Sequence, residues 1–205
     1  FGKPTVRRTH DSINTVANAR TLEFLSSTDA RTIAEIGVDQ GATSDAILAW
    51  LGGRGVVHLF DFEDCLDRVT QRLRANHLTN FVAHGNSRRT LDSYNWSLMR
   101  MLQQNPAPLF DYVYLDGAHT WAIDALTFFL IDQLLKPGGY IDFDDYHWTI
   151  DESPTVNPRV YPRMREMYTE EQMQTSQVAL IVDLLVRRLG RYEEVVPDKI
   201  FRKAT

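Results

Sequence analysis

Short apolar runs alternate with stretches of helical spacing along most of this chain, and this alternation restricts the fold more than any other feature. Runs rich in β-branched and aromatic residues predict strands. We expect strands at residues 32–37, 56–62, 80–84, 110–116 and 139–143. Strands joined by helical crossovers form a parallel sheet, because such crossovers are almost always right-handed. The pattern therefore predicts an α/β fold with helices on both faces of a mostly parallel sheet.

The remaining segments predict helices and a closing hairpin. Helical spacing links Leu66, Val69 and Leu73, and a well-buried helix is expected at residues 120–135. An opening helix at residues 11–25 should pack outside the sheet. A later helix has one apolar face, made by Val178, Ile181, Val182 and Leu185. Residues 191–196 and 199–203 predict two antiparallel strands with a turn at Pro197-Asp198.

Length and charge indicate one domain that acts on small molecules. With 205 residues, of which 43% are hydrophobic, the chain fits a single domain over residues 1–205, with a helical cap at residues 1–30 and a substrate loop at residues 146–162. A formal net charge of −5 gives no general attraction to nucleic acid. The apolar runs are shorter than the roughly 18 residues that cross a bilayer, so we expect a soluble, cytoplasmic protein. The oligomeric state is left open, with a homo-oligomer as one alternative.

A loop of glycine, acidic and hydroxyl residues follows the first strand, where open α/β sheets bind ligands. Its candidate ligand-binding residues are Glu35, Gly37, Asp39, Gly41, Thr43 and Ser44. The glycines permit a tight turn, while Thr43 and Ser44 can cap the next helix and donate to a carboxylate. Asp39 occupies a position where a dinucleotide site needs glycine, which disfavours NAD or FAD. Glu35 and Asp39 would instead attract a ligand with an ammonium and a sulfonium group.

Candidate contacts for a nucleoside follow the next two strands. Asp61 ends the second strand, where an acid in this architecture accepts hydrogen bonds from both ribose hydroxyls. Phe62 lies beside it, and Glu63 is the second candidate for the ribose. After the third strand, Asn86 could bind the exocyclic amine of adenine and Ser87 adds a hydroxyl. Each residue taken alone could equally be a turn residue, a loop acid or a helix cap, but their order and spacing favour a ligand site.

The set resembles the ordered motifs of class I S-adenosylmethionine-dependent methyltransferases. The motifs are Glu-x-Gly-x-x-x-Gly, the acid after the second strand, Gly85-Asn86-Ser87, Asp116-Gly117-Ala118-His119 and Leu135-Lys136-Pro137-Gly138-Gly139. The resemblance covers roughly residues 32–146. It implies a Rossmann-like seven-stranded methyltransferase fold with strand order 3-2-1-4-5-7-6 and an antiparallel seventh strand. It also implies S-adenosylmethionine as cofactor, bound by the residues named above and by Asp116.

Carboxylates gather after two strands that this fold makes neighbours. Asp116 ends the fourth strand, and Asp144 and Asp145 follow the fifth. Two unit charges ~4 Å apart repel by about 4 kcal/mol at an effective dielectric constant near 20. A divalent cation such as Mg²⁺, which prefers oxygen ligands, would compensate for this repulsion. The arrangement is similar to that of metal-dependent O-methyltransferases of the catechol and macrocin types, and this resemblance implies Asp116, Asp144 and Asp145 as the metal ligands.

The sequence therefore predicts a methyltransferase that modifies a hydroxyl of a small molecule with Mg²⁺. His119 is the first candidate for the general base and His147 the second. Ala118 stands where the macrocin-type pattern often has an acid. The alternatives are a metal-independent methyltransferase acting on nitrogen, carbon or oxygen, with His119 or Asp144 as base, and a binding module that holds S-adenosylmethionine without catalysis. An NAD-dependent oxidoreductase ranks below both.

Overall fold

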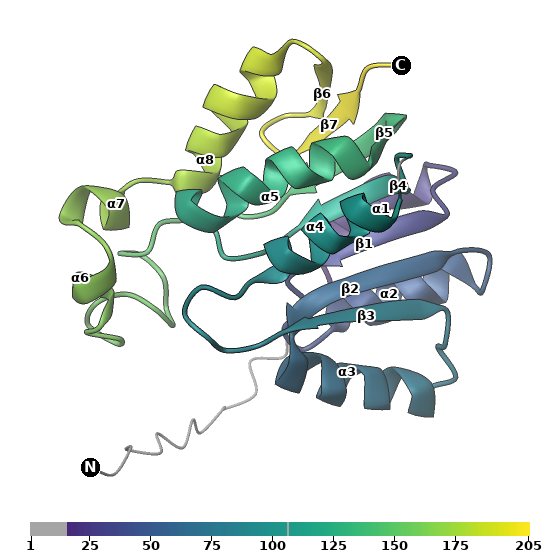
Figure 1. The fold of residues 1–205 in the computed structure, drawn as a ribbon, viewed down its shortest axis with the longest axis horizontal. Helices are drawn as coiled ribbons and strands as arrows, with labels where there is room; N and C mark the ends of the chain where they lie inside the picture. The colour runs from purple at the N-terminus through teal and green to yellow at the C-terminus, as the bar shows by residue number, and fades with distance from the viewer. Residues whose placement is uncertain (1–15, 106) are drawn as a thin grey trace.

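The computed structural model describes residues 16–105 and 107–205, which form one seven-stranded sheet (Figure 1). The strand order is β3-β2-β1-β4-β5-β7-β6. β7 pairs antiparallel with both β5 and β6, and every other pair of neighbours is parallel. The predicted fold and strand order are confirmed.

The strands and helices alternate through β5, as the sequence predicts. The strands are β1 (Thr32–Ile36), β2 (Val56–Phe62), β3 (Phe81–Asn86), β4 (Phe110–Leu115), β5 (Leu135–Phe143), β6 (Tyr192–Val196) and β7 (Ile200–Lys203). The helices are α1 (Ala19–Ser26), α2 (Ala42–Leu51), α3 (Glu63–Ala75), α4 (Tyr94–Gln104), α5 (Trp121–Leu134), α6 (Met164–Met167), α7 (Glu170–Gln174) and α8 (Gln177–Ile181). A π-helical turn (Val182–Val186) and a 3-10 turn (Arg187–Leu189) continue α8.

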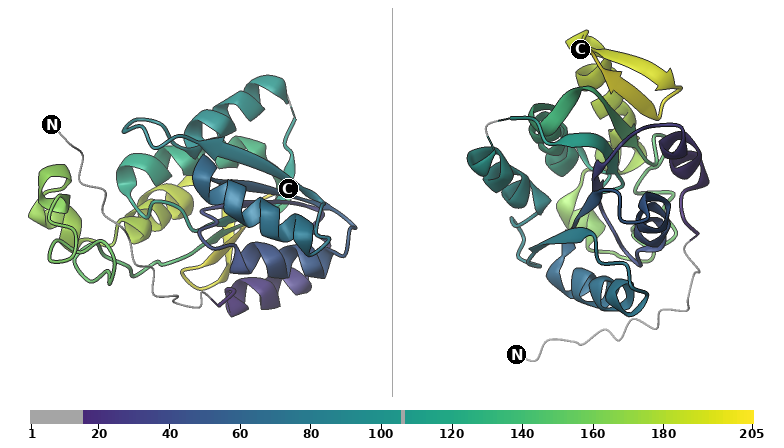
Figure 2. Two further views of the ribbon diagram at one scale, coloured as in Figure 1. Left: turned by 90° about the horizontal axis from the view of Figure 1, so that it is seen from below. Right: turned by 90° about the vertical axis from the view of Figure 1, so that its right-hand side faces the viewer.

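Two hydrophobic cores lie on opposite faces of the sheet (Figure 2). Helices α4, α5 and α8 pack on one face, and α1, α2 and α3 pack on the other. Successive residues of β4 show the period of two: Val113 and Leu115 face the first core, whereas Tyr112 and Tyr114 face the second. Because β4 is buried on both faces, its residues are apolar or aromatic apart from the half-buried Asp111, as expected for a central parallel strand.

Three elements differ from the sequence expectation. β5 begins at Leu135 rather than Gly139, because Leu135 pairs with Phe110 before the register shifts. α1 begins at Ala19, and the side chain of Asn18 accepts a hydrogen bond from the Thr21 amide as its N-cap. Residues 11–15 of the expected opening helix lie outside the described residues. Helix α4 was not predicted.

The segment after β5 folds over the carboxyl edge of the sheet. Ile150, Ser153 and Asn157 are buried, although the segment has no long helix or strand. The Ser153 hydroxyl accepts hydrogen bonds from the amides of Thr155 and Val156, which fixes a tight turn there. No helix in residues 16–105 and 107–205 has the length and apolar character needed to cross a membrane.

Candidate active site

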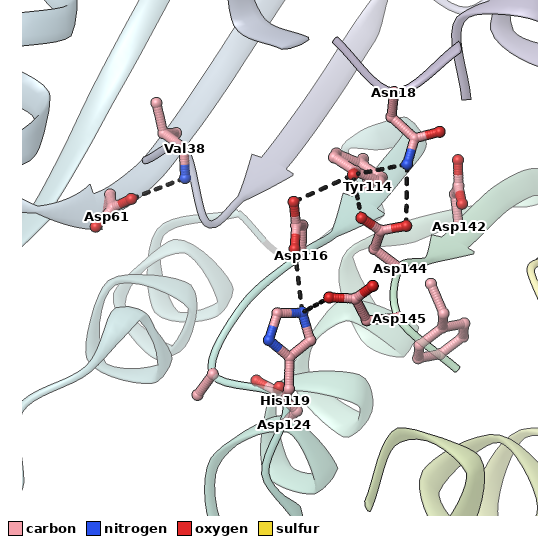
Figure 3. A network of polar contacts seen from close by, with 12 residues as sticks. Asn18, Val38, Asp61, Tyr114, Asp116, His119, Asp124, Asp142, Asp144 and Asp145 are labelled. Carbon is pink, nitrogen blue, oxygen red and sulfur yellow. Dashed lines mark hydrogen bonds and ion pairs between the residues drawn. The ribbon is translucent and has the colours of Figure 1, made fainter. Parts of the chain in front are cut away.

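The loop after β1 adopts a shape that its glycines require. Gly37 has a φ of +88°, and a Cβ there would lie 1.7 Å from the carbonyl oxygen of Asp116. The ends of β1 and β4 therefore touch through backbone alone. Asp61 fixes the rest of the loop, since its Oδ2 accepts hydrogen bonds from the amides of Val38 and Asp39 at 2.8 and 2.9 Å (Figure 3). The predicted ribose acid thus also shapes the glycine loop.

A buried carboxyl lies beneath this loop. Glu35 is only 1% exposed, and the Ser44 hydroxyl donates a hydrogen bond of 2.5 Å to it. Burial raises the pKa of Glu35 to about 8, even though the Ser44 hydrogen bond acts in the opposite direction. Glu35 lines a cavity of about 170 Å³, hereafter the first cavity, together with Asn18, Thr43, Asp116 and Asp144.

The hydroxyl residues do not cap α2 as predicted. The N-cap of α2 is Gly41, which makes no side-chain cap hydrogen bond. The Ser44 hydroxyl is committed to Glu35, and Thr43 Oγ1 accepts a hydrogen bond of 3.3 Å from the Asn18 amide. The helix therefore presents free amides at the loop, while Ser44 serves the buried acid and Thr43 ties the N-terminal segment to α2.

A second cavity, of about 470 Å³, adjoins the first at Gly37, Asp39 and Asp116. Asp61, Phe62 and Asn86 line it, as the sequence predicts for an adenosine site. The Asn86 Oδ1 atom is buried and accepts no hydrogen bond within the described residues, which leaves it free for a donor on a ligand. Arg88 lies 4.2 Å from the centre of the Phe62 ring and forms a further wall.

Ser87 and Glu63, which were also candidates for contacts with the nucleoside, do not face the second cavity. The amide and hydroxyl of Ser87 both donate to Asp92, at 2.7 and 2.6 Å, and Ser87 is not among the residues that line the second cavity. Glu63 does not line this cavity either; its Cγ atom packs against Gly85, where an added Cβ would lie 2.6 Å away. Among the acids after β2, only Asp61 therefore faces the cavity.

The turn after β4 is built on two buried residues that were not predicted. The Tyr94 hydroxyl accepts a 2.9 Å hydrogen bond from the Ala118 amide and donates to Asp124. A Cβ on Gly117 would lie 2.3 Å from the same Tyr94 oxygen, so glycine is needed there. His119 follows with a φ of +56°. The only signal in the sequence was an aspartate in the first turn of an apolar helix, a common position that does not by itself indicate function.

His119 lies between two carboxylates (Figure 3). Its Nε2 is 3.1 Å from Asp116 Oδ1 and 3.6 Å from Asp145 Oδ2. Burial would lower the pKa of His119, but the hydrogen bond and charge of Asp116 and the charge of Asp145 together outweigh burial and raise it. The three ligand atoms lie within 4.8 Å of one another, close enough to surround one metal ion.

Asp144 lies near this cluster but interacts with other residues. Its carboxylate accepts hydrogen bonds of 2.9 Å from Tyr114 and from the side chain of Asn18. Lys199 Nζ is 3.4 Å from Asp144 and 2.9 Å from the fully buried Asp142. Within the described residues, the group of candidate metal ligands is Asp116, His119 and Asp145, so His119 stands where Asp144 was expected.

Cationic side chains of the protein therefore offset part of the repulsion between these carboxylates, a role that was expected for a metal ion. Lys199 is 8% exposed and neutralises charge at Asp142 and Asp144, while a protonated His119 would do so at Asp116 and Asp145. Lys199 was predicted only as a strand residue. The predicted strand order places β7 beside β5, but no motif marks the side chain of Lys199 as the partner of the acids at the end of β5.

A third cavity, of about 520 Å³, lies on the other side of His119. It shares Gly117, Ala118 and His119 with the second cavity, and Asp145, Trp148 and the segment after β5 close it. His147 is exposed, packs edge-on against Tyr146 and lines none of the three cavities. The turn at residues 116–119 is thus the place where all three cavities come together.

Comparison with known protein families agrees with this architecture. A family model described as a methyltransferase domain matches residues 34–146, more than half of the chain. The chain belongs to this methyltransferase family. The predicted relationship to class I S-adenosylmethionine-dependent methyltransferases is confirmed, and no curated protein matches the chain.

Solved structures share the fold at low sequence identity. An O-methyltransferase from Bacillus cereus in complex with SAH is 17% identical, with a TM-score of 0.63 over 95% of this chain and 84% of that one. TomG, an O-methyltransferase from Streptomyces achromogenes in complex with SAM, is 18% identical, with a TM-score of 0.51 over 77% and 71%. An rRNA methylase from Streptococcus thermophilus is 12% identical, with a TM-score of 0.51 over 95% and 100%. These likenesses concern the fold alone, which does not decide the acceptor.

Proposed function

We propose that this protein transfers a methyl group from S-adenosylmethionine to a hydroxyl group of a small molecule. The observation that carries the proposal is the position of His119 and Asp116 between the cavities. The first and second cavities meet at Asp116, and His119 separates the second cavity from the third. A cofactor on one side and an acceptor on the other would bring the reacting atoms together at this turn.

The residues of the first two cavities fit S-adenosylmethionine. Asn86 offers an unpaired buried oxygen to an adenine amine, and Asp61 has acceptor capacity beyond the loop amides that it binds. Glu35 and Asp39 offer negative charge where the amino-acid end of the cofactor would lie. A cation there would favour the ionised form of Glu35 and so compensate for the burial that raises its pKa.

When bound, S-adenosylmethionine supplies a methyl carbon to the acceptor oxygen, and the electrons of the broken carbon–sulfur bond remain on sulfur. The chain would hold the acceptor hydroxyl at Asp116 and His119, with the oxygen directed at that carbon. His119 is oriented by the hydrogen bond from its Nε2 to Asp116, so its other ring nitrogen, Nδ1, would take the hydroxyl proton when the imidazole is neutral. The fixed turn above Tyr94 and Asp124 keeps the imidazole in place.

A divalent metal remains part of the proposal. Asp116 and Asp145 are the two carboxylates already in place, and Asp144 would complete the expected trio by exchanging its contacts with Lys199, Tyr114 and Asn18. With His119 as third ligand, a nitrogen donor would favour Mn²⁺ over Mg²⁺. Such an ion would lower the pKa of the acceptor hydroxyl. In that case His119 could not also act as the base.

The proposal is tested by titration and turnover. Calorimetry should detect binding of S-adenosylmethionine but not of NAD. Acceptors found by screening labelled methyl transfer would then be assayed in EDTA and after addition of Mg²⁺ or Mn²⁺. Activity lost in EDTA and restored by either ion supports the metal; full activity in chelator eliminates it and leaves metal-free transfer assisted by His119. Cofactor binding without transfer to any acceptor would support the binding-module alternative.

A further inference from the structure

The third cavity has a lining that restricts the chemistry of its occupant. Most of its walls are apolar or aromatic, and they come from the segment after β5 and from α6 and its C-terminal end. These side chains are Trp148, Ile150, Pro154, Val156, Met164 and Tyr168. The acidic and basic groups, Asp145 and His119, lie at one end of the cavity, by the turn after β4. Ser153 and Thr155 also line the cavity, but the Ser153 hydroxyl already accepts hydrogen bonds from the amides of Thr155 and Val156. The cavity therefore has a reactive polar end and an apolar body.

No lysine or arginine is among the residues that line this cavity in the described part of the chain. The basic side chains of the same segment are engaged or directed elsewhere. Arg165 donates to the carbonyl of Pro158, and Arg163 lies 4.0 Å from Glu166 on the surface. A phosphate or carboxylate buried here would find no lysine or arginine, and it would have to compete with Asp116 and Asp145 for a protonated His119, which makes burial of an anion unfavourable.

One polar atom of the wall has no partner. Thr120 is 5% exposed, and its hydroxyl oxygen makes no hydrogen bond within the described residues. Thr120 is the N-cap of α5, yet its side chain makes no cap hydrogen bond, and the first amide of the helix instead donates to Gln177. Because a buried hydroxyl without a partner costs about 1–3 kcal/mol, a ligand group that pairs with it would bind favourably.

We infer that the third cavity binds an uncharged aromatic alcohol or phenol whose ring packs against Trp148 and which carries a second polar atom that pairs with Thr120. The inference rests on the proposed function for the identity of the reacting group, but not for the occupancy of the cavity. The ring of Trp148 lies 5.2 Å from that of His119, so a flat acceptor stacked there would have its hydroxyl beside the base. Sugars fit less well, because the walls offer few free hydrogen-bond partners.

The test uses matched probes and matched variants of the SAH-loaded protein. The probes are monocyclic phenols and aryl alcohols, with and without a second polar substituent; the same compounds carrying a carboxylate; and monosaccharides. Ligand-observed NMR measures binding, and labelled S-adenosylmethionine measures transfer. Neutral aromatic probes should bind about tenfold or more tightly than their carboxylated forms. Val156→Lys should reduce or reverse that preference, whereas Val160→Lys, a matched change on the exposed part of the same segment, should not.

Two further variants keep the outcome interpretable. Thr155→Lys places the same charge at a more exposed position of the lining, in case Val156→Lys does not fold. Thr120→Val should reduce the advantage of probes with the second polar atom and leave the others unchanged. Preferred binding of sugars or carboxylates, no binding of any probe, or unchanged selectivity in all lining variants would overturn the inference. Selective binding without methyl transfer would instead contradict the proposed function, and transfer to a sugar would contradict only the inference.

Discussion

The two halves of the candidate site are constructed in different ways. At the ends of β1, β2 and β3, the backbone sets the geometry: Gly37 touches the end of β4, and Asp61 binds loop amides. At the ends of β4 and β5, the geometry depends on side-chain charges, with Lys199 and His119 placed among the acids. The first half is fixed by local sequence and the second by contacts between distant segments, so the two should respond differently to mutation.

The largest effect is expected at the backbone contact. Gly37→Ala would place a Cβ 1.7 Å from the Asp116 carbonyl oxygen and strain a residue with a φ of +88°. Overpacking and strain together should lower the free energy of unfolding by about 4 kcal/mol or more. Gly53→Ala is the matched control, since Gly53 has a φ of +78° but no atom within 4 Å of the added Cβ. Urea denaturation should show a loss of only about 1 kcal/mol there; equal losses would show that the close contact is not decisive.

Removal of the buried cation should have the next largest effect. Lys199→Met leaves the fully buried Asp142 without its partner at 2.9 Å and should destabilise the protein by about 3–4 kcal/mol. Burial already raises the pKa of Asp142. Its carboxyl can therefore take up a proton in the folded variant, and the loss should be smaller near pH 5 than near pH 8.

The double variant Lys199→Met/Asp142→Asn provides the control, because it removes the unpaired charge. It should recover most of the lost stability, and the difference between pH values should shrink. If the single variant were as stable as the wild type at pH 8, Lys199 would not be the cation that balances these acids.

Cofactor binding should depend on Asp61. Asp61→Asn keeps the shape of the side chain but weakens its hydrogen bonds to the amides of Val38 and Asp39 and to a ribose. Affinity for S-adenosylmethionine, measured by calorimetry, should fall by about 1–3 kcal/mol. Glu63→Gln, an equivalent change just outside the second cavity, should leave affinity unaltered. The reverse result would assign the ribose to Glu63.

The pH dependence of stability tests the buried carboxyl beneath the glycine loop. The pKa of Glu35 is about 8 in the folded protein, against 4.5 for an ordinary glutamate. The folded state therefore binds more protons between these values, so its contribution to stability is full below about pH 4.5 and is lost as pH rises to about 8. Glu35→Gln should flatten this part of the stability profile of the cofactor-free protein and weaken binding of S-adenosylmethionine. An unchanged slope in the variant would place the titration elsewhere.

Local patterns were enough to predict the strands and helices, and the resemblance to class I methyltransferases supplied the order of the strands. The runs of apolar, β-branched and aromatic residues, the helical spacing and the order of the motifs place β1 to β5 and the closing hairpin within a few residues of where they lie. The loop at residues 35–41 is also readable, because glycines and acids at fixed distances act on their own neighbourhood. The hydroxyl residues of this half were less predictable, because Thr43 and Ser44 do not cap α2 and Ser87 donates to Asp92.

The acceptor half was less predictable, because the partners of its acidic residues come from segments that are distant in the sequence. Asn18 reaches Asp144 from the N-terminal segment, Tyr94 supports the turn at His119 from α4, and Lys199 comes from the turn just before β7. None of these three residues belongs to a recognisable motif, and their contacts follow only from the three-dimensional fold. Asp116, Asp144 and Asp145 were predicted to converge, but Asp116 and Asp145 meet at His119, while Asp144 contacts Tyr114, Asn18 and Lys199. This arrangement depends on the turns after β4 and β5, where His119 and Asp145 both have positive φ.

The central claim is that His119 and Asp145 act on the acceptor rather than on the cofactor. The most direct measurement is the single-turnover rate of methyl transfer by Asp145→Asn at saturating S-adenosylmethionine, with an acceptor identified by screening. Asp145 lines the third cavity but not the first or second, so cofactor occupancy should be preserved. The account predicts a rate about a hundredfold or more below that of the wild type, because the acceptor oxygen would be misplaced. A wild-type rate in this variant would contradict the account.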